Sequence, residues 1–191
     1  GIGHAFHVSA SAVGQMVAVF TLCYALSAPI CATLLAGRSV RQILLLAMAV
    51  FIIANAATAL VTSFAQLLLV RAIAGAAAGL FSPTAAAAAV ALAPPEKKGR
   101  ALGFILGGMG VGTVIGVPLG LLLAEHTQWQ NVFLLVSLLG LVAAVGIYWK
   151  FPSFKAKSTP SLRSRMHMLV NPKVTETIAI TVMVSIASLG L

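Results

Sequence analysis

One ionised residue, Arg71, lies inside a long apolar block that runs from residue 66 to residue 92. A guanidinium within a membrane-spanning helix costs about 2.5–3.5 kcal/mol at the helix centre, which favours a position facing a cavity or a partner. Gly75 and Gly79 follow at intervals of four, so a helix would place them on the same face as Arg71. A side chain that reaches back to the membrane edge is the alternative. We interpret Arg71 as a functional charge in the interior.

A second pattern consists of glycines in the block 99–124. Two series are spaced by four residues: Gly99, Gly103 and Gly107, and then Gly108, Gly112, Gly116 and Gly120. Residues four apart share a helix face, so each series predicts a groove that another helix backbone can approach closely. Pro118 removes one backbone hydrogen bond and is expected to bend the helix. Close packing alone is the simpler alternative, but glycines combined with a proline favour a helix that bends or slides against a neighbour.

The residue inventory argues against catalysis. Intramembrane enzymes need paired carboxylates, a nucleophile with a base, or a metal cluster. The three acidic residues, Glu96, Glu125 and Glu176, lie at or near the edges of apolar blocks. His4 and His7 are three residues apart, but no Cys, Asp or Glu lies nearby to complete a metal site. We therefore expect no enzyme activity, no bound metal and no cofactor.

Composition identifies the elements that must position these residues. Of the 191 residues, 60% are hydrophobic and 8% charged, and the mean hydropathy is +1.06. Soluble domains carry about a quarter charged residues, so a soluble enzyme or DNA-binding domain is excluded. A membrane-spanning helix needs about 20 apolar residues, and the sequence has six such blocks: residues 12–35, 42–61, 66–92, 99–124, 132–149 and 174–191. The predicted fold class is all-α, a polytopic transmembrane helix bundle.

The net charge of +9 is better explained by membrane topology than by a nucleic-acid partner. All Lys and Arg residues other than Arg71 fall in or beside alternate connectors, which are residues 36–41, 93–98 and 150–173. Basic residues gather on the cytoplasmic side of membrane proteins. We therefore expect residues 1–11 to lie outside and residues 150–173 to be cytoplasmic.

Three motifs resemble those of major facilitator superfamily transporters, and the resemblance extends over nearly the whole chain. The pattern Leu67-x-x-x-Arg71-x-x-Ala74-Gly75-x-x-x-Gly79 is similar to the family's fourth-helix motif, whose arginine is associated with proton coupling. The pattern Gly108-x-x-x-Gly112-x-x-x-Gly116-Val-Pro118-Leu-Gly120 resembles the fifth-helix motif of drug:proton antiporters, in the form typical of arabinose-efflux-like permeases. Trp129-Gln130-x-x-Phe133 is similar to a Trp-Arg-x-x-Phe motif before the sixth helix, with Gln130 in place of arginine.

The connector after the first block matches its counterpart in that family only in part. The family's motif, Gly-x-Leu-Ala-Asp-Arg-x-Gly-Arg-Arg, corresponds here to residues 33–42. Arg38 and Arg41 match, whereas Gly37 replaces the aspartate and Val40 the second glycine. The resemblance implies a cytoplasmic gate loop at Gly37, Arg38 and Arg41, with a charge relay that lacks its aspartate. Alternatively, the two arginines only anchor the loop at the anionic leaflet.

The resemblance also implies the organisation of the chain. The six blocks would be the family's second to seventh helices, so the chain is interpreted as a fragment of a major-facilitator-type bundle. Residues 1–149 would form most of the amino-terminal bundle, 150–173 a cytoplasmic linker, and 174–191 the start of the carboxy-terminal bundle. We expect the full-length protein to be a monomer in a bacterial cell membrane.

The leading functional hypothesis is a secondary transporter that exports a small molecule by proton antiport, with alternating access between two halves. Its partners would be a small-molecule substrate, protons and the lipid bilayer. The alternative is a non-transporting membrane scaffold or assembly subunit, although packing alone gives no reason for Arg71. The candidate cavity residues with distinctive chemistry are Gln15, Tyr24, Met109 and Thr113, which suit an amphiphilic or uncharged solute.

Overall fold

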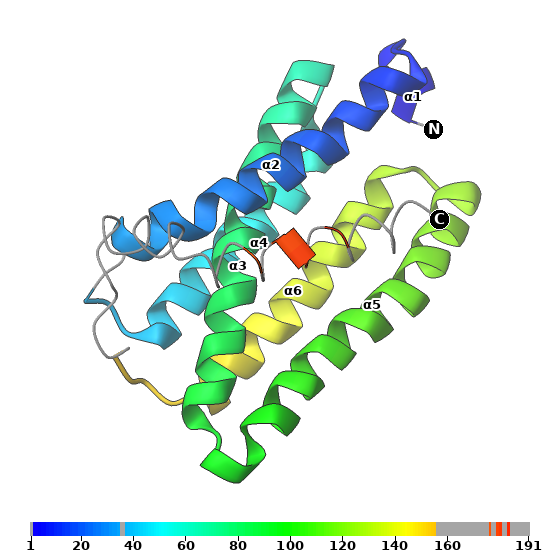
Figure 1. Ribbon diagram of the computed structural model, residues 1–191. Coiled ribbons are helices and arrows are strands. Elements are labelled where there is room, and N and C mark those ends of the chain that lie inside the picture. The colour runs from blue at the N-terminus through cyan, green and yellow to red at the C-terminus, as the bar shows by residue number, and fades with distance from the viewer. Residues whose placement is uncertain (1, 35–36, 156–175, 177–178, 181–182, 184–191) are drawn as a thin grey trace. The chain divides into compact units, whose positions relative to one another are not determined.

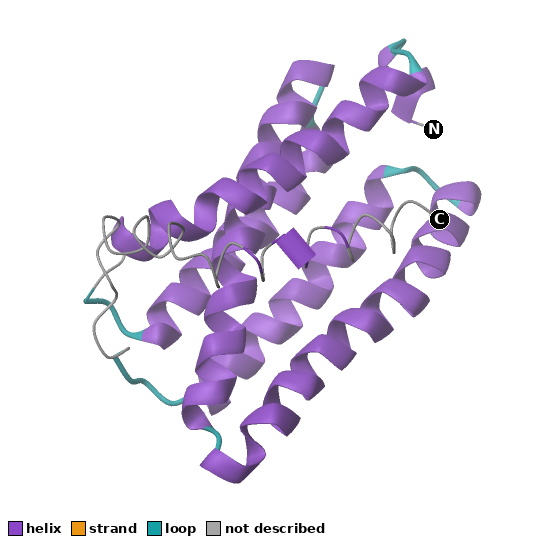
Figure 2. Cartoon of the chain, viewed as in Figure 1, coloured by secondary structure: helices purple, strands orange, loops and turns teal. Residues whose placement is uncertain are grey.

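The computed structural model describes residues 2–34 and 37–155, together with positions 176, 179, 180 and 183. This part of the chain is helical and contains no strand (Figure 1 and Figure 2). The elements are α1 (Ile2–Phe6), α2 (Ala10–Leu34), α3 (Val40–Ala57), η1 (Thr58–Leu60), α4 (Phe64–Leu92), η2 (Pro95–Lys97), α5 (Lys98–His126) and α6 (Gln130–Lys150). The predicted linker beyond Lys155 and nearly all of the predicted block 174–191 lie outside the described residues.

The helices match the predicted apolar blocks. Among the described residues, four helical stretches are long and apolar enough to cross a membrane: Val40–Leu60, Phe64–Leu92, Pro95–His126 and Gln130–Lys150. They correspond to the second to fifth predicted blocks. The first predicted block corresponds to α2, a helix of 25 residues that includes the apolar stretch Ser11–Ser27. The all-α transmembrane fold class is thus confirmed.

Two of the helices begin with the same local signal. Ser39 precedes α3, and its hydroxyl accepts a hydrogen bond from the backbone N–H of Gln42, whose side chain in turn accepts from the Ser39 N–H. Ser63 and Gln66 make the same reciprocal pair at the start of α4. This capping box satisfies N–H groups that have no partner within the first helical turn. The caps fix where the two central helices start.

The interior of the bundle is formed by α2, α3, α4 and α6. α4 packs against both α2 and α3, while α6 packs against α3. Leu44 and Ala47 of α3 and Leu67 and Ala74 of α4 are almost completely buried. α5 is different, since it contacts α4 and α6 but has no buried residue. In Figure 1 it runs at the edge of the unit, beyond α6.

Two glycines of α4 set the distance between α4 and α2. A Cβ built at Gly75 would lie 2.9 Å from the carbonyl carbon of Phe20, and one built at Gly79 would lie 2.8 Å from the carbonyl carbon of Tyr24. Side chains at these positions would collide with backbone, which cannot rotate away. The two helices therefore approach each other at backbone distance because both positions are glycine.

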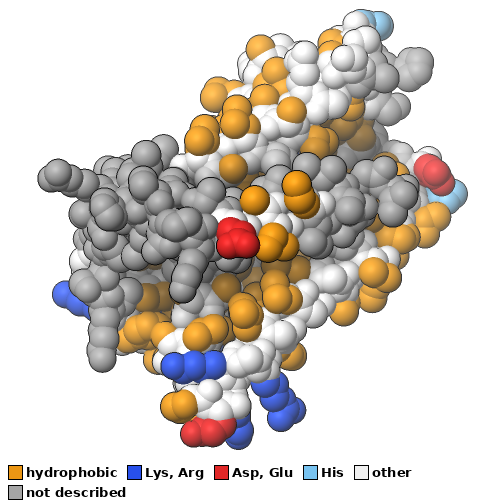
Figure 3. All heavy atoms as spheres, viewed as in Figure 1, with side chains coloured by type: hydrophobic (Ala, Val, Ile, Leu, Met, Phe, Trp, Pro, Cys, Tyr) orange, Lys and Arg blue, Asp and Glu red, His pale blue; other side chains and the backbone are white. Residues whose placement is uncertain are grey.

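One end of this unit is basic. α3 and α5 begin there, α4 and α6 end there, and the Lys and Arg side chains gather toward it while His lies at the opposite end (Figure 3). The described basic residues of this end are Arg38, Arg41, Lys97, Lys98, Arg100, Lys150 and Lys155. The described parts of the three basic connectors thus lie at one end, and the placing of that end in the cytoplasm stays a prediction.

The chain that follows α6 folds back onto the loop before α3. Ser39 and Lys155 form an isolated antiparallel bridge, and the Val40 N–H donates to the Phe154 carbonyl at 2.9 Å. The rings of Phe151 and Phe154 stack with their centroids 6.0 Å apart. Both side chains pack against a buried cluster that includes Val40. The first residues of the predicted linker thus belong to the basic end of the bundle.

Candidate functional site

Arg71 is the eighth residue of α4, and its side chain is only 9% exposed. It lies on the face of α4 that also carries Gly75 and Gly79. The guanidinium is therefore inside the helical unit, covered by side chains of α2, α3, η1 and α6.

Within the described part of the chain, the guanidinium donates two hydrogen bonds, both from Nη2. One goes to Oδ1 of Asn55 at 2.8 Å, and a longer one goes to Oγ1 of Thr58 at 3.4 Å. Asn55 and Thr58 are almost completely buried and lie three residues apart, so they share one face at the end of α3. Both acceptors are neutral, and the positive charge of Arg71 is solvated without being cancelled.

Both acceptors are oriented by their own helix. The Nδ2 of Asn55 donates to the Phe51 carbonyl at 2.7 Å, which turns its Oδ1 toward Arg71. The Thr58 hydroxyl donates to the Ala54 carbonyl at 3.1 Å, which leaves its oxygen lone pairs as acceptors. Because each side chain directs a donor to the backbone, its oxygen is the atom that faces the guanidinium and accepts from it.

Aromatic rings cover the guanidinium. The Cζ of Arg71 lies 4.4 Å from the ring centroid of Phe133 in α6 and 6.0 Å from that of Phe20 in α2. A cation within about 6 Å of an aromatic face is attracted by the ring quadrupole, and the attraction grows when water is excluded. The backbone of Phe20 is also the contact of Gly75, so the close approach of α2 brings this ring to Arg71.

Part of the guanidinium has no acceptor. Nε of Arg71 is buried and has no hydrogen-bond partner among the described residues. Arginine carries five N–H donors and never an acceptor, and a buried donor without a partner costs about 1–3 kcal/mol. This N–H is therefore a donor that an anion or another oxygen acceptor could satisfy.

The predicted glycine groove of α5 is open in the described part of the chain. A Cβ built at Gly108, Gly112 or Gly116 meets nothing within 4 Å there, and one built at Gly120 meets only a Val132 methyl at 3.6 Å. The helix continues without a break through Pro118. A contact of this face with another helix stays a prediction.

The predicted gate loop is attached to α6. Gly37 has a φ of 87°, a left-handed conformation that favours glycine, which gives this position a backbone reason for lacking the aspartate. Arg38 is exposed, whereas Arg41 is half-buried and its Nη2 donates to the carbonyl of Tyr148. The Arg41 Cζ also lies 4.9 Å from the centroid of the Tyr148 ring. A cation at the carboxyl end of α6 is favourable to its helix dipole.

The four predicted cavity residues do not gather into one site. Gln15 and Met109 are exposed, and the hydroxyl of Thr113, also exposed, donates to the Met109 carbonyl of its own helix at 3.1 Å. Tyr24 is half-buried, and its ring stacks on Phe20 with the centroids 6.4 Å apart. Tyr24 alone is thereby close to the surroundings of Arg71, through Phe20. A substrate cavity lined by the four residues stays a prediction.

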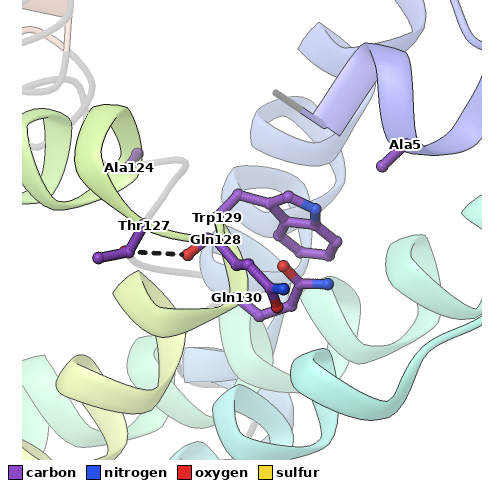
Figure 4. A pocket seen from close by; sticks show the side chains of 6 residues that line it. All are labelled: Ala5, Ala124, Thr127, Gln128, Trp129 and Gln130. Carbon is purple, nitrogen blue, oxygen red and sulfur yellow. Dashed lines mark hydrogen bonds between the residues drawn. The ribbon is translucent and has the colours of Figure 1, made fainter.

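A pocket of about 360 Å³ lies at the end of the unit opposite the basic residues (Figure 4). It is lined by Ala5, Ala124, Thr127, Gln128, Trp129 and Gln130. A series of ring contacts joins it to the arginine site: Trp129 meets Phe6 at 5.8 Å and Phe133 at 6.0 Å between centroids. Phe133 then covers Arg71. Of the sequence motif Trp129-Gln130-x-x-Phe133, the two aromatic residues thus connect this end of the unit to the charge.

Asn55 and Thr58 were not singled out from the sequence. The available signal was an amide in the otherwise apolar block 42–61, followed by a hydroxyl three residues later. Such polar residues are expensive in a membrane-spanning helix and generally face the interior. Their pairing with Arg71 depends on how α3 and α4 sit against each other, which the sequence pattern does not contain.

The sequence model of the Major Facilitator Superfamily matches residues 1–190 of the chain. The chain belongs to this superfamily. With its four long apolar helices among the described residues, it is a multi-pass membrane protein.

Relatives from several bacteria match most of the chain. An MFS-type transporter of Bacillus subtilis, YbcL, is 29% identical over 94% of the chain and 46% of its own length. The putative transporter AraJ of Escherichia coli is 28% identical over 90% of the chain and 43% of its own length. A chloramphenicol resistance protein of Streptomyces lividans is 33% identical over 87% of the chain and 44% of its own length. The chain thus spans less than half the length of these superfamily members.

Proposed function

We propose that the full-length superfamily member is a secondary transporter that exports a small molecule in exchange for protons, by alternating access of two halves. The observation that carries this proposal is the buried Arg71, whose hydrogen-bond partners Asn55 and Thr58 are neutral. A guanidinium that needed only to be neutralised or anchored would be better served by a carboxylate or by the membrane surface. A charge kept uncancelled in the interior suits a group that acts on a second charge.

Arg71 is not itself the proton carrier, because arginine does not lose its proton in proteins. Its role in the proposal is to stabilise the ionised form of a carboxylate outside the described residues. That carboxylate would lie on the helix that corresponds to the family's first, or in the carboxy-terminal half of the full-length protein. Protonation of that carboxylate weakens the pair, and the weakened pair permits the bundle to rearrange. Proton entry is thereby coupled to the change of access.

Everted membrane vesicles that contain the protein encoded by the full reading frame test this proposal. Chloramphenicol is the first probe, because the Streptomyces relative is named for resistance to it, and ethidium is a second amphiphilic probe. We expect uptake driven by the proton gradient. Arg71→Ala is expected to reduce it at least about 10-fold with normal membrane insertion, since a buried charge pair is lost, and Arg71→Lys to retain part of it because the charge stays.

Two results would count against the proposal. Normal gradient-driven uptake by Arg71→Ala would make the arginine a structural residue. Uptake of neither probe by the unmodified protein, at verified expression, would favour the non-transporting scaffold.

We also propose the topology that the basic end supports: residues 1–11 outside and residues 150–173 in the cytoplasm. Single cysteines replacing His126 or Lys157, in a protein without Cys23 and Cys31, would be labelled in whole cells with an impermeant thiol reagent. We expect labelling at position 126 and none at position 157. The reverse pattern would overturn the orientation.

A further inference from the structure

Arg71 is bonded to a neutral amide, that of Asn55, at a position where a carboxylate of nearly the same shape would also fit. Asn55 lies 2.8 Å from Nη2, a distance at which an aspartate would form a strong ion pair. The amide has nearly the same shape as the carboxylate but carries no charge. It therefore fixes the guanidinium without cancelling its charge.

The amide also has a task that a carboxylate cannot perform. Its Nδ2 donates to the Phe51 carbonyl at 2.7 Å, and a carboxylate has no proton to donate there. The two bonds of Asn55 thus run from the α3 backbone through the side chain to Arg71. Thr58 repeats the arrangement from Ala54 with a longer bond to the same Nη2.

The guanidinium is thus held at Nη2 and covered on one face, and its Nε–H is left without an acceptor among the described residues. α3 holds Nη2, and the ring of Phe133 lies 4.4 Å from Cζ. Nε remains buried without a partner in the part of the chain that the structure describes. Because the guanidinium is planar and rigid, fixing Nη2 and one face also fixes the direction of the Nε–H.

We propose that Asn55 is a positioning residue for proton coupling: it holds Arg71 through a neutral acceptor, so that the guanidinium presents its full charge and its Nε–H to the coupling carboxylate. This inference rests on the proposed function, since it assumes that such a carboxylate exists. It adds that the charge on Arg71 is available only while residue 55 is uncharged.

The competing explanation is that Asn55 merely satisfies a buried polar group during folding. Stability measurements do not separate the two explanations, because both predict a loss when the hydrogen bond is removed. The protonation midpoint of the coupling carboxylate separates them, since only a role in positioning charge alters it.

The experiment uses the purified full-length protein in detergent and pH-dependent infrared difference spectroscopy, with protons as the only ligand. The C=O stretch of a protonated carboxyl group reports the midpoint directly. We expect Asn55→Asp to move this midpoint upward by about one to three pH units, as Arg71→Ala does, because in both variants the carboxylate loses an uncancelled positive charge within reach. Asn55→Ala keeps the charge of Arg71 but frees its orientation, and a smaller upward movement is expected.

A matched control is Asn131→Asp, the same substitution in the first turn of α6, where a carboxylate is favourable to the helix N-terminus. It is expected to leave the midpoint in place. An unchanged midpoint in Asn55→Asp, with Arg71→Ala shifting it, would overturn the role of Asn55 and leave the proposed function standing. An unchanged midpoint in Arg71→Ala would instead refute the proposed function itself.

Discussion

α4 and α5 carry the same small-residue spacing but use it in opposite ways. In α4, Gly75 and Gly79 meet the backbone of α2 at distances that exclude any side chain. In α5, Gly108, Gly112 and Gly116 face no described atom within 4 Å. A glycine series predicts which face of a helix can be approached closely, but not which segment approaches it. For these α5 glycines, no such segment is among the described residues.

The largest effect is expected from one methyl group in α4. Gly79→Ala places a Cβ 2.8 Å from the Tyr24 carbonyl carbon, and overpacking of this kind costs about 1–3 kcal/mol. We expect the purified full-length protein to unfold several degrees lower in a thermal scan. Gly112→Ala is the matched control, because its methyl meets no described atom within 4 Å. Equal losses in the two variants would mean that α5 is packed as tightly as α4 in the complete protein.

A large change in α5 is expected to affect transport more than folding. In Gly116→Leu the side chain meets no described atom, so insertion and expression should be normal, but the predicted contact with a further helix would be held apart. Gradient-driven uptake of the probe should fall several-fold. Leu122→Ala, at an exposed position of the same helix, should keep it. Unchanged uptake by Gly116→Leu would show that the glycine face of α5 is incidental.

The smallest effect is expected at Gly140 in α6, whose surroundings are less crowded than those of Gly79 and more crowded than those of Gly112. A Cβ at Gly140 would lie 3.0 Å from Cγ1 of Ile52 and 3.6 Å from the sulfur of Met48. Both contacts are side chains that can move, and alanine gains about 0.5–1 kcal/mol of helix stability over glycine. Gly140→Ala should therefore change the unfolding temperature by no more than a degree or two. A decrease in unfolding temperature as large as that of Gly79→Ala would mean that α6 is packed at Gly140 as tightly as α4 is at Gly79.

Hydropathy was sufficient to predict the positions of the helices, because a span of about 20 apolar residues is imposed by the bilayer. It also identified Arg71 as a candidate functional residue, since a charged residue is rare inside such a span. The partners of Arg71 were out of reach, because Asn55, Thr58 and Phe133 come from elements whose rotation and register are decided by packing. For the same reason the sequence could not tell whether Gln15 and Met109, which lie on different helices, come together in one cavity.

The ring contacts from Trp129 through Phe133 to Arg71 make the fluorescence of Trp129 sensitive to the surroundings of the arginine. Indole emission depends on neighbouring rings and charges within a few ångströms, and Trp129 lies 6.0 Å from the ring that covers the guanidinium. The other tryptophan of this chain, Trp149, is 75% exposed at the basic end. With Trp149→Phe, the emission from this chain comes from Trp129 alone. Fluorescence of that single indole would then follow any displacement of Phe133, so movements around the buried charge could be timed in the millisecond range without a label.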